Sequence, residues 1–169
     1  AYLFARTSDV WNQQAKITGQ GTITEDLFGF TVAIDGDLTV VGAHGTNQEA
    51  GVAFIFAREN AIWRQQAKLE ANDSTPGDAF GYSVDIHQQT VIVGAPKNGV
   101  VGDDAGAAYV FVKQGETWIQ QAKLIAADAA IGDQFGIAVA TEKDTAIIGA
   151  WLDDVTAPEI GDAPDAGSA

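Results

Sequence analysis

Apolar and polar positions alternate in short runs along most of the chain. In the stretch WRQQAKL (63–69), the odd-numbered residues fall on one face and the even-numbered residues on the other. A period of two over four to eight residues is typical of a half-buried β-strand. Turn sequences such as DGD (35–37) and KQGE (113–116) separate these runs. Because no helical period of useful length is present, the pattern predicts an all-β fold.

The alternating runs recur three times in the same order. The repeated sequences are WNQQAKI (11–17), WRQQAKL (63–69) and WIQQAKL (118–124), then LFGFTVAI (27–34), AFGYSVDI (79–86) and QFGIAVAT (134–141), then TVVGAHG (39–45), VIVGAPK (91–97) and AIIGAWL (146–152). Internal repeats of roughly 40–50 residues with four strands each are typical of β-propeller blades. We therefore expect a chain of propeller blades.

Each blade is expected to hold four antiparallel strands, which we letter A to D from the centre of the propeller outward. The predicted A strands are Gly29–Asp35, Gly81–His87 and Gly136–Thr141; the B strands are Leu38–Ala43, Thr90–Ala95 and Thr145–Ala150; the C strands are Tyr2–Arg6, Ala53–Arg58 and Ala108–Lys113; the D strands are Trp11–Ile17, Trp63–Leu69 and Trp118–Leu124. The Gln pair in each D strand is unusual. We expect one Gln of each pair to bond backbone at the blade edge and the other to face water.

A Phe-Gly pair (80–81) followed by Gly-Ala-Pro (94–96) resembles the FG-GAP repeat, and the resemblance extends over all three units. That family forms the propeller blades of integrin α-subunits and of many bacterial surface proteins. We expect the motif's Phe residues to fill the space between neighbouring blades, and its Gly residues to allow a close approach or a bulge at the end of each B strand. The Phe positions are Phe28, Phe80 and Phe135; the Gly positions are Gly42, Gly94 and Gly149.

This order of strands predicts four parts in the chain. Residues 1–26 form an outer half-blade of C and D strands, residues 27–78 and 79–133 each form a blade, and residues 134–169 form an inner half-blade of A and B strands with an acidic loop. Both half-blades leave a sheet edge open, and open edges are templates for further pairing.

Closure of the half-blades within one chain would give three blades, fewer than the roughly four to eight of known propellers. Three other ways of completing the half-blades remain open. Two copies can exchange half-blades and form a six-bladed ring, which we favour. The residues can also be a window from a longer propeller of six or seven blades. The absence of methionine, even at position 1, favours the window, whereas the matching repeat phase of Ala1 and Ala169 favours assembly. An open head-to-tail polymer is the less favoured third arrangement.

The charge balance excludes some classes of partner. The chain holds 23 Asp and Glu residues against 9 Lys and Arg, for a net charge of −14. Such a surface repels nucleic acid and anionic membranes. No apolar run predicts membrane insertion, and no signal peptide is present. With no cysteine, the chain has neither disulfides nor thiol chemistry.

Most acidic residues fall in the B–C and D–A loops, which the strand directions place on one face. Solubility and loop solvation are the favoured explanation, and cation binding or capture of a basic partner is the alternative. The longest B–C loop (151–167) can supply oxygen ligands for one Ca²⁺. Its candidate ligands are Asp153, Asp154, Glu159, Asp162 and Asp165. Solvation of a surface loop is the simpler explanation of these acids. The A–B turns are too short and too poor in acids for integrin-type calcium loops.

Nothing in the sequence indicates catalysis. The two histidines lack a recognisable nucleophile motif, and neither a zinc-protease motif nor a phosphate-binding loop is present. By resemblance to the family, we expect an extracellular or cell-surface recognition and adhesion module with a protein or glycan ligand. Its partner face is predicted to include Trp151, His44, Asp103 and Asp104. A self-assembling structural subunit is the alternative, and a propeller-based hydrolase is a remote one.

Overall fold

The computed structural model describes residues 1–99, 102–157, 161–163 and 167–168, and of residues 155–157 and 161–163 it describes the backbone alone. All of the strand pairs in the sheets are antiparallel. One four-stranded sheet has the order β3 (Val32–Asp35), β4 (Leu38–Ala43), β5 (Val52–Glu59) and β6 (Ile62–Leu69). The other has the order β7 (Ser83–His87), β8 (Thr90–Ala95), β9 (Ala107–Gln114) and β10 (Thr117–Leu124).

Three two-stranded sheets complete the described structure. They pair β1 (Tyr2–Thr7) with β2 (Val10–Lys16), β11 (Ala138–Glu142) with β12 (Thr145–Gly149), and β13 (Val155–Ala157) with β14 (Gly161–Ala163). The helical elements α1 (Thr46–Glu49) and η1 (Thr24–Asp26) are single turns in loops. No helix in the described part of the chain is long and apolar enough to cross a membrane.

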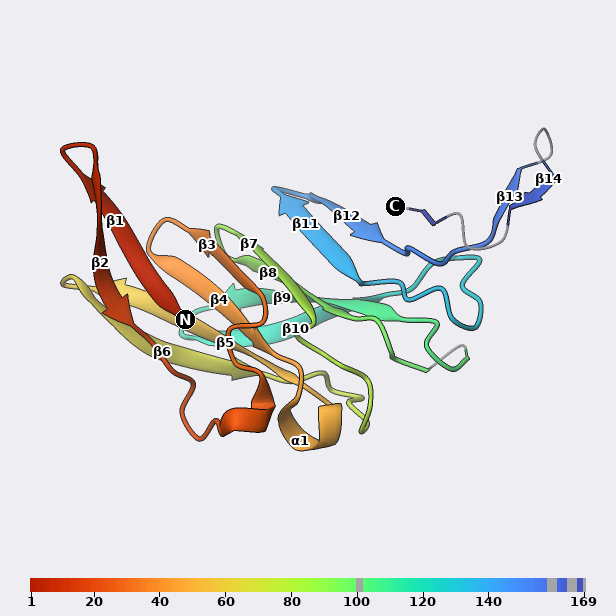
Figure 1. Cartoon of the computed structure of the whole chain (residues 1–169), viewed down its shortest axis with the longest axis horizontal. Coiled ribbons are helices and arrows are strands. Elements are labelled where there is room, and N and C mark those ends of the chain that lie inside the picture. The colour runs from red at the N-terminus through yellow and green to blue at the C-terminus, as the bar shows by residue number, and fades with distance from the viewer. Residues whose placement is uncertain (100–101, 158–160, 164–166, 169) are drawn as a thin grey trace.

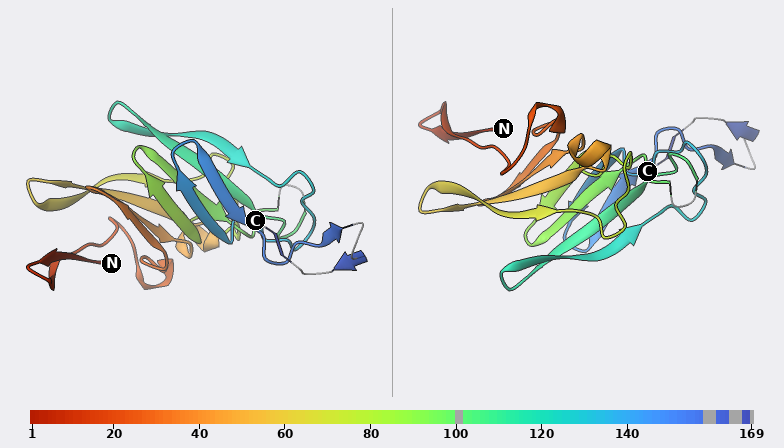
Figure 2. Two further views of the ribbon diagram at one scale, coloured as in Figure 1. Left: turned by 90° about the horizontal axis from the view of Figure 1, so that it is seen from above. Right: turned by 90° about the horizontal axis from the view of Figure 1, so that it is seen from below.

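The sheets stand in a row like successive blades (Figures 1 and 2). The inner strands β3, β7 and β11 contact one another along this row, with β7 in the middle. The β1–β2 hairpin lies at one end and the β11–β12 hairpin toward the other (Figure 1). This arrangement confirms the predicted all-β blades of four antiparallel strands. The ring itself is not closed by the described residues, so how the half-blades are completed stays a prediction.

The B, C and D strands lie within one residue of their predicted ends, but the prediction for the start of the A strands was wrong. β3, β7 and β11 begin two or three residues later than expected, at Val32, Ser83 and Ala138. The Phe-Gly motif forms a turn instead, because the backbone N–H of the residue after each Gly donates to the carbonyl two residues before that Gly. Each motif Gly has a positive φ of 87–94°, which strand geometry does not allow.

The motif phenylalanines pack into the cores of the blades. Phe80 is fully buried, and its ring centroid lies 5.5 Å from that of Tyr109 and 5.9 Å from that of Phe111. The same core contains Val40 and Ile55 of the preceding blade, so Phe80 lies where two blades meet. The expectation that this Phe fills the space between blades is confirmed.

Two of the three motif glycines at the ends of B strands allow a close backbone approach between blades. A Cβ atom on Gly42 would overlap the carbonyl oxygen of Gly81, and one on Gly94 would overlap that of Gly136. Gly149 has no such neighbour, since its nearest contact would be the Cβ atom of Ala138 at 3.7 Å. The predicted close approach is therefore confirmed for the two blades that have a following neighbour.

The Gln pairs bind neighbouring blades together. Gln65 Oε1 accepts a hydrogen bond from the backbone N–H of Gln20 at 2.8 Å, and Gln120 Oε1 accepts one from that of Asn72 at 2.9 Å. The register shifts beside both Gln residues, so each Gln pair includes a β-bulge. The first Gln of these pairs thus bonds backbone as expected, and it does so across a blade junction.

Candidate functional site

Short-range hydrogen bonds fix the shape of the D–A loops. A buried aspartate two residues before each motif Phe accepts a hydrogen bond from a backbone N–H three residues earlier. The pairs are Asp26 with Ile23 at 2.8 Å, Asp78 with Thr75 at 2.8 Å, and Asp133 with Ala130 at 2.6 Å. An aspartate that closes a local turn in this way is a structural group. Each of these acids therefore has a structural role in its own loop, and Asp26 also lines the pocket described below.

A ladder of backbone hydrogen bonds joins the B–C loop of one blade to the D–A loop of the next. The first junction lies between the β3–β6 blade and the β7–β10 blade. There the N–H groups of Gly77, Ala79 and Phe80 donate to the carbonyls of Gln48, Glu49 and Ala50, at 3.1, 2.7 and 3.0 Å. The second junction repeats the ladder with 3.0 Å bonds to the carbonyls of Asp103, Asp104 and Ala105. The loops are therefore fixed relative to each other, and the side chains between them are held in place.

A pocket of about 510 Å³ opens at the first junction. Its walls come from the first D–A loop, the first B–C loop, the start of the following blade and, through Lys97, the second B–C loop. The side chains that give it chemical character are Glu25, Leu27, His44, Glu49, Tyr82 and Lys97. Ligand sites are concave, with apolar walls and a few converging polar groups, and this pocket has both features.

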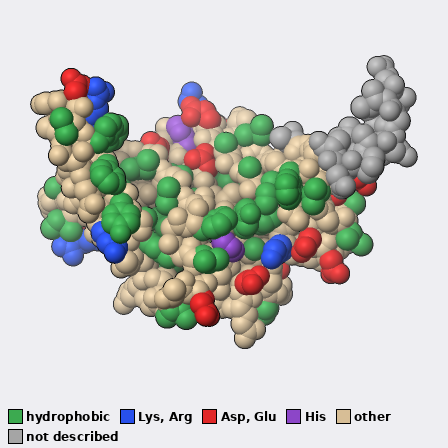
Figure 3. Space-filling model, viewed as in Figure 1, with side chains coloured by type: hydrophobic (Ala, Val, Ile, Leu, Met, Phe, Trp, Pro, Cys, Tyr) green, Lys and Arg blue, Asp and Glu red, His purple; other side chains and the backbone are tan. Residues whose placement is uncertain are grey.

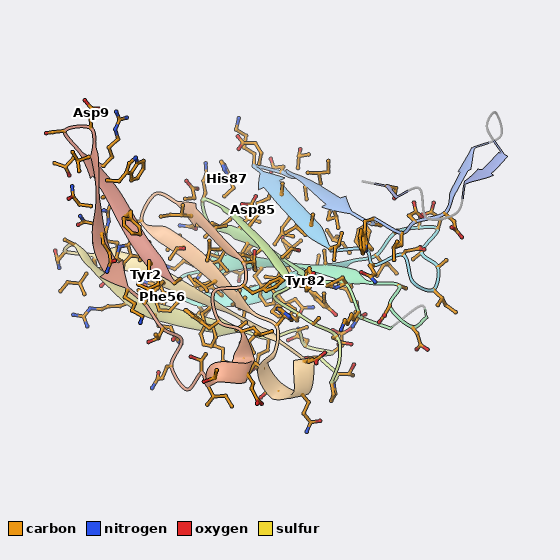
Figure 4. The ribbon with its side chains drawn as sticks, in the orientation of Figure 1. Tyr2, Asp9, Phe56, Tyr82, Asp85 and His87 are labelled. Carbon is orange, nitrogen blue, oxygen red and sulfur yellow. The ribbon has the colours of Figure 1, made fainter. Side chains whose placement is uncertain are left out.

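Three rings meet beside this pocket, and two of them, those of His44 and Tyr82, line it. The imidazole centroid of His44 lies 4.3 Å from the ring centroid of Phe30 and 5.2 Å from that of Tyr82, and the last two are 4.9 Å apart. Phe30 remains 52% exposed, so part of the cluster faces solvent. Tyr82 lies near the centre of the molecule, where the chain enters β7 (Figure 4). Hydrophobic side chains form a band across the middle of this face, with acidic side chains below it (Figure 3).

The charged groups of the pocket act on His44. Lys97 Nζ lies 3.5 Å from Glu49 Oε2. Burial lowers the pKa of His44 below its ordinary value, Glu49 opposes that change, and Lys97 adds to it. The Nδ1 atom of His44 is buried and has no hydrogen-bond partner among the described residues. Burial therefore favours the neutral form of the imidazole.

The pKa of His44 should respond in opposite directions to its two charged neighbours. In Glu49→Gln the stabilising carboxylate is lost, so we expect a still lower pKa for His44. In Lys97→Gln the repelling ammonium is lost, so we expect a higher pKa. An NMR titration of the imidazole Cε1–H resonances measures both changes. Glu116→Gln, in a turn of the following blade, is the control and should leave the midpoint in place.

The predicted partner residues do not form one site. His44 borders the pocket, whereas Trp151 stands at the same position of the third B–C loop and is 59% exposed. Its indole Nε1 donates to Gln134 Oε1 at 2.9 Å. Asp103 and Asp104 belong to the second B–C loop, where their carbonyls take part in the backbone ladder. Each of the three loops thus presents its residues at a different place along the row of blades.

The structure describes the side chains of only two of the five predicted metal ligands. Asp153 and Asp154 are described, and the carbonyl of Asp153 accepts a hydrogen bond from the N–H of Gly167 at 2.9 Å. The side chains of Glu159, Asp162 and Asp165 lie outside the described residues. Within the described part of the chain, no three His, Asp or Glu side chains gather in a group that could hold a metal ion. Calcium binding at loop 151–167 stays a prediction.

Sequence reasoning missed Glu49, Tyr82 and Lys97 as residues of the pocket, and Phe30 as the ring packed beside it. One signal was available, since an aromatic residue follows the Phe-Gly pair in the first two units and Ile137 follows it in the third. The remaining residues could not be assigned from the sequence, because they come from loops of two different blades.

The comparisons with known proteins agree with the fold. The model of the FG-GAP repeat matches residues 11–56, 63–111 and 118–169. The search of curated proteins returned no match. The three matched segments together cover most of the chain, and they coincide with the repeated strands, the Phe-Gly turns and the close-packed glycines described above. The chain therefore belongs to the FG-GAP repeat family.

Proposed function

We propose that this chain is a non-enzymatic recognition module, active outside the cell or at its surface, whose first-junction pocket takes a basic segment of a partner protein. The observation that carries the proposal is the pocket itself. It places the rings of His44 and Tyr82, with Phe30 packed beside both, next to the carboxylates of Glu25 and Glu49, between loops that backbone hydrogen bonds hold together. A preorganised site loses little conformational entropy on binding.

The chemistry of the pocket favours a cationic group. An aromatic face attracts a Lys or Arg side chain by about 0.5–2 kcal/mol, depending on how far the pair is desolvated. The two carboxylates outnumber Lys97, which Glu49 already neutralises in part. The net charge of −14 also draws basic partners from a distance and accelerates encounter. A role in adhesion follows if the partner is itself fixed to a surface.

An array of basic, acidic and neutral peptides, printed beside a glycan array, tests the proposal. We expect basic peptides to be retained, and to be released as the salt concentration rises. For the strongest binder, Tyr82→Ala should weaken affinity about tenfold, and Glu49→Gln about fivefold, by loss of cation–π and charge contacts. Glu116→Gln is the matched control, because it removes the same charge from a distant turn.

The outcomes separate the possible ligands. Retention of glycans with no dependence on Glu49 would replace the basic peptide by a sugar as the ligand of this pocket. Binding that survives Tyr82→Ala and Glu49→Gln unchanged would place recognition elsewhere on the protein. Thermal unfolding of each variant checks that the fold is intact. We expect little change, because both substituted side chains lie at the protein surface or at a pocket wall.

A further inference from the structure

A network of mostly buried polar side chains joins the loop before β7 to the β7–β10 blade. Lys123 on β10 donates from Nζ to Asp73 Oδ2 at 2.6 Å and to Asn98 Oδ1 at 2.9 Å. Asn98 in turn donates from Nδ2 to Asp78 Oδ2 at 3.0 Å. Asn98 and Asp78 are only 2% and 4% exposed, and the side chain of Lys123 is 19% exposed. The structure thus brings an amine, a carboxamide and two carboxylates into direct contact, largely out of water.

We propose that Nζ of Lys123 attacks Cγ of Asn98 and that the two side chains become joined by an amide, an intramolecular isopeptide bond formed with loss of ammonia. An uncharged amine is a nucleophile toward a carbonyl carbon. The net reaction converts one ammonium and one carboxamide into an amide and a free ammonium ion, so it consumes no oxidant, cofactor or further reactant. This modification is separate from the recognition pocket and does not depend on the ligand proposed there.

The two hydrogen bonds of the Asn98 side chain fix its orientation. An ammonium can only donate and a carboxylate can only accept, so the amide oxygen faces Lys123 and the amide nitrogen faces Asp78. Because a C=O bond is about 1.2 Å long, Nζ lies no more than about 4 Å from Cγ. The backbone of Asn98 is held as well, since its N–H donates to the carbonyl of Ala95 at 3.1 Å. Groups positioned in this way react as if at effective concentrations of up to about 10⁵–10⁸ M.

The two carboxylates supply the proton transfers. Asp73 takes one proton from the ammonium of Lys123, and the neutral amine then attacks Cγ of Asn98 while the carbonyl electron pair moves onto Oδ1. Asp78 passes a second proton from Nζ to Nδ2, the electron pair returns, the Cγ–Nδ2 bond breaks and ammonia leaves. The ammonia removes the proton from Asp73 and departs as ammonium, so atoms and charge balance. Both carboxylates lie within the roughly 2.6–3.2 Å over which side chains act as general acids and bases.

Tyr109 holds the base and the nucleophile together. Its hydroxyl donates to Asp73 Oδ1 at 2.9 Å, which leaves Oδ2 of the same carboxylate directed at the lysine. Its fully buried ring lies 5.2 Å from Nζ of Lys123. Burial, and then the hydrogen bond to Asp73, raise the pKa of Tyr109 well above its ordinary value. The hydroxyl therefore keeps its proton and stays a donor.

The β3–β6 blade retains the lysine without the network. Lys68 occupies the equivalent position of β6, but Thr46 and Gly21 stand where the β7–β10 blade has its carboxamide and its base. Lys68 instead pairs with the half-exposed Glu70 at 2.6 Å. Packing of a blade in this fold therefore does not require the network, which favours a chemical role for its extra groups.

The bond ties the outermost strand, β10, to the second B–C loop. Such a cross-link restricts the unfolded chain as a disulfide does, and the sequence has no cysteine from which a disulfide could form. Lys97, which lines the first-junction pocket, directly precedes Asn98. The cross-link thus also anchors one wall of that pocket.

Mass spectrometry tests the proposal on the folded protein. The intact chain should weigh less than its sequence predicts by one molecule of ammonia. Trypsin should leave the bond after Lys123 uncut and release residues 98–113 joined to residues 114–143 as a branched peptide. Cyclisation of Asn98 onto the backbone of Gly99 also loses ammonia, but it leaves the site after Lys123 open to trypsin. The full sequence mass, or a loss of ammonia with a normal cut after Lys123, overturns the proposal.

Variants test the assigned roles. Lys123→Arg keeps the positive charge but has no amine nucleophile, so it should have the full sequence mass, whereas the matched control Lys68→Arg should still lose ammonia. Asp73→Asn and Asp78→Asn should each slow the linkage by about 10²-fold or more, so that freshly purified protein is largely unlinked. Thermal unfolding checks that each variant is folded. Equally fast linkage in both aspartate variants would contradict the roles given to the carboxylates.

Discussion

Phe80→Ala should lower the free energy of unfolding by about 3–5 kcal/mol, the range found for a fully buried aromatic residue cut back to alanine. Phe80 is fully buried, and its ring packs edge-on against Tyr109 and Phe111 of its own blade while it borders residues of the preceding blade. The loss therefore combines burial, ring contacts and a cavity at a blade junction. Urea unfolding followed by tryptophan fluorescence measures the change.

The matched variant is Phe135→Ala, which removes the same side chain from the β11–β12 half-blade. Phe135 is only partly buried in the described structure, so we expect about half the loss. Phe80→Leu retains most of the volume and should cost about 1 kcal/mol. If Phe80→Ala and Phe135→Ala destabilise the protein equally, the two-sided packing of Phe80 is not what makes it costly to remove.

Gly94→Ala should cost about 3 kcal/mol through overpacking, although it adds a single methyl group. The new Cβ atom would overlap the carbonyl oxygen of Gly136, and that oxygen already accepts a hydrogen bond from Ser83 Oγ at 2.7 Å. Backbone atoms lie on both sides of the contact, so the blades must move apart. The midpoint of urea unfolding should fall with little change in the slope.

Gly99→Ala is the control for this substitution. A Cβ atom at Gly99 would meet the carbonyl oxygen of Gly102 at 3.6 Å, an ordinary contact, so we expect a change below about 0.5 kcal/mol. Should Gly94→Ala prove as mild as Gly99→Ala, the close approach of the blades is not required for stability, and the motif glycine needs another explanation.

The strands were predictable from the sequence because their signals are local. Alternation, turn residues and a threefold repeat gave the B, C and D strands to within one residue of their ends. The A strands were predicted too long, because the Phe-Gly motif looks like the start of an extended run. Its glycine instead takes a positive φ, so that its N–H can pair with the end of the B strand. That conformation is not visible in the hydrophobic pattern.

The candidate site was only partly predictable. His44 was singled out for its place on the acidic face, but Tyr82 and Lys97 join it only through the packing of the next blade. The acidic pattern also did not separate structural acids from exposed ones. Asp26, Asp78 and Asp133 belong to it by sequence, yet all three are buried and close local turns.

By itself, the sequence determined the number of repeats, the strands of each repeat and the family, because each of these depends on residues close together in the chain. The tertiary structure decided which glycines touch a neighbouring blade, which glutamines bridge two blades and where a pocket opens. The paired glycines and glutamines lie about 40 to 50 positions apart and the pocket draws on residues 23 to 97, so only the stacking of the blades brings them within contact distance.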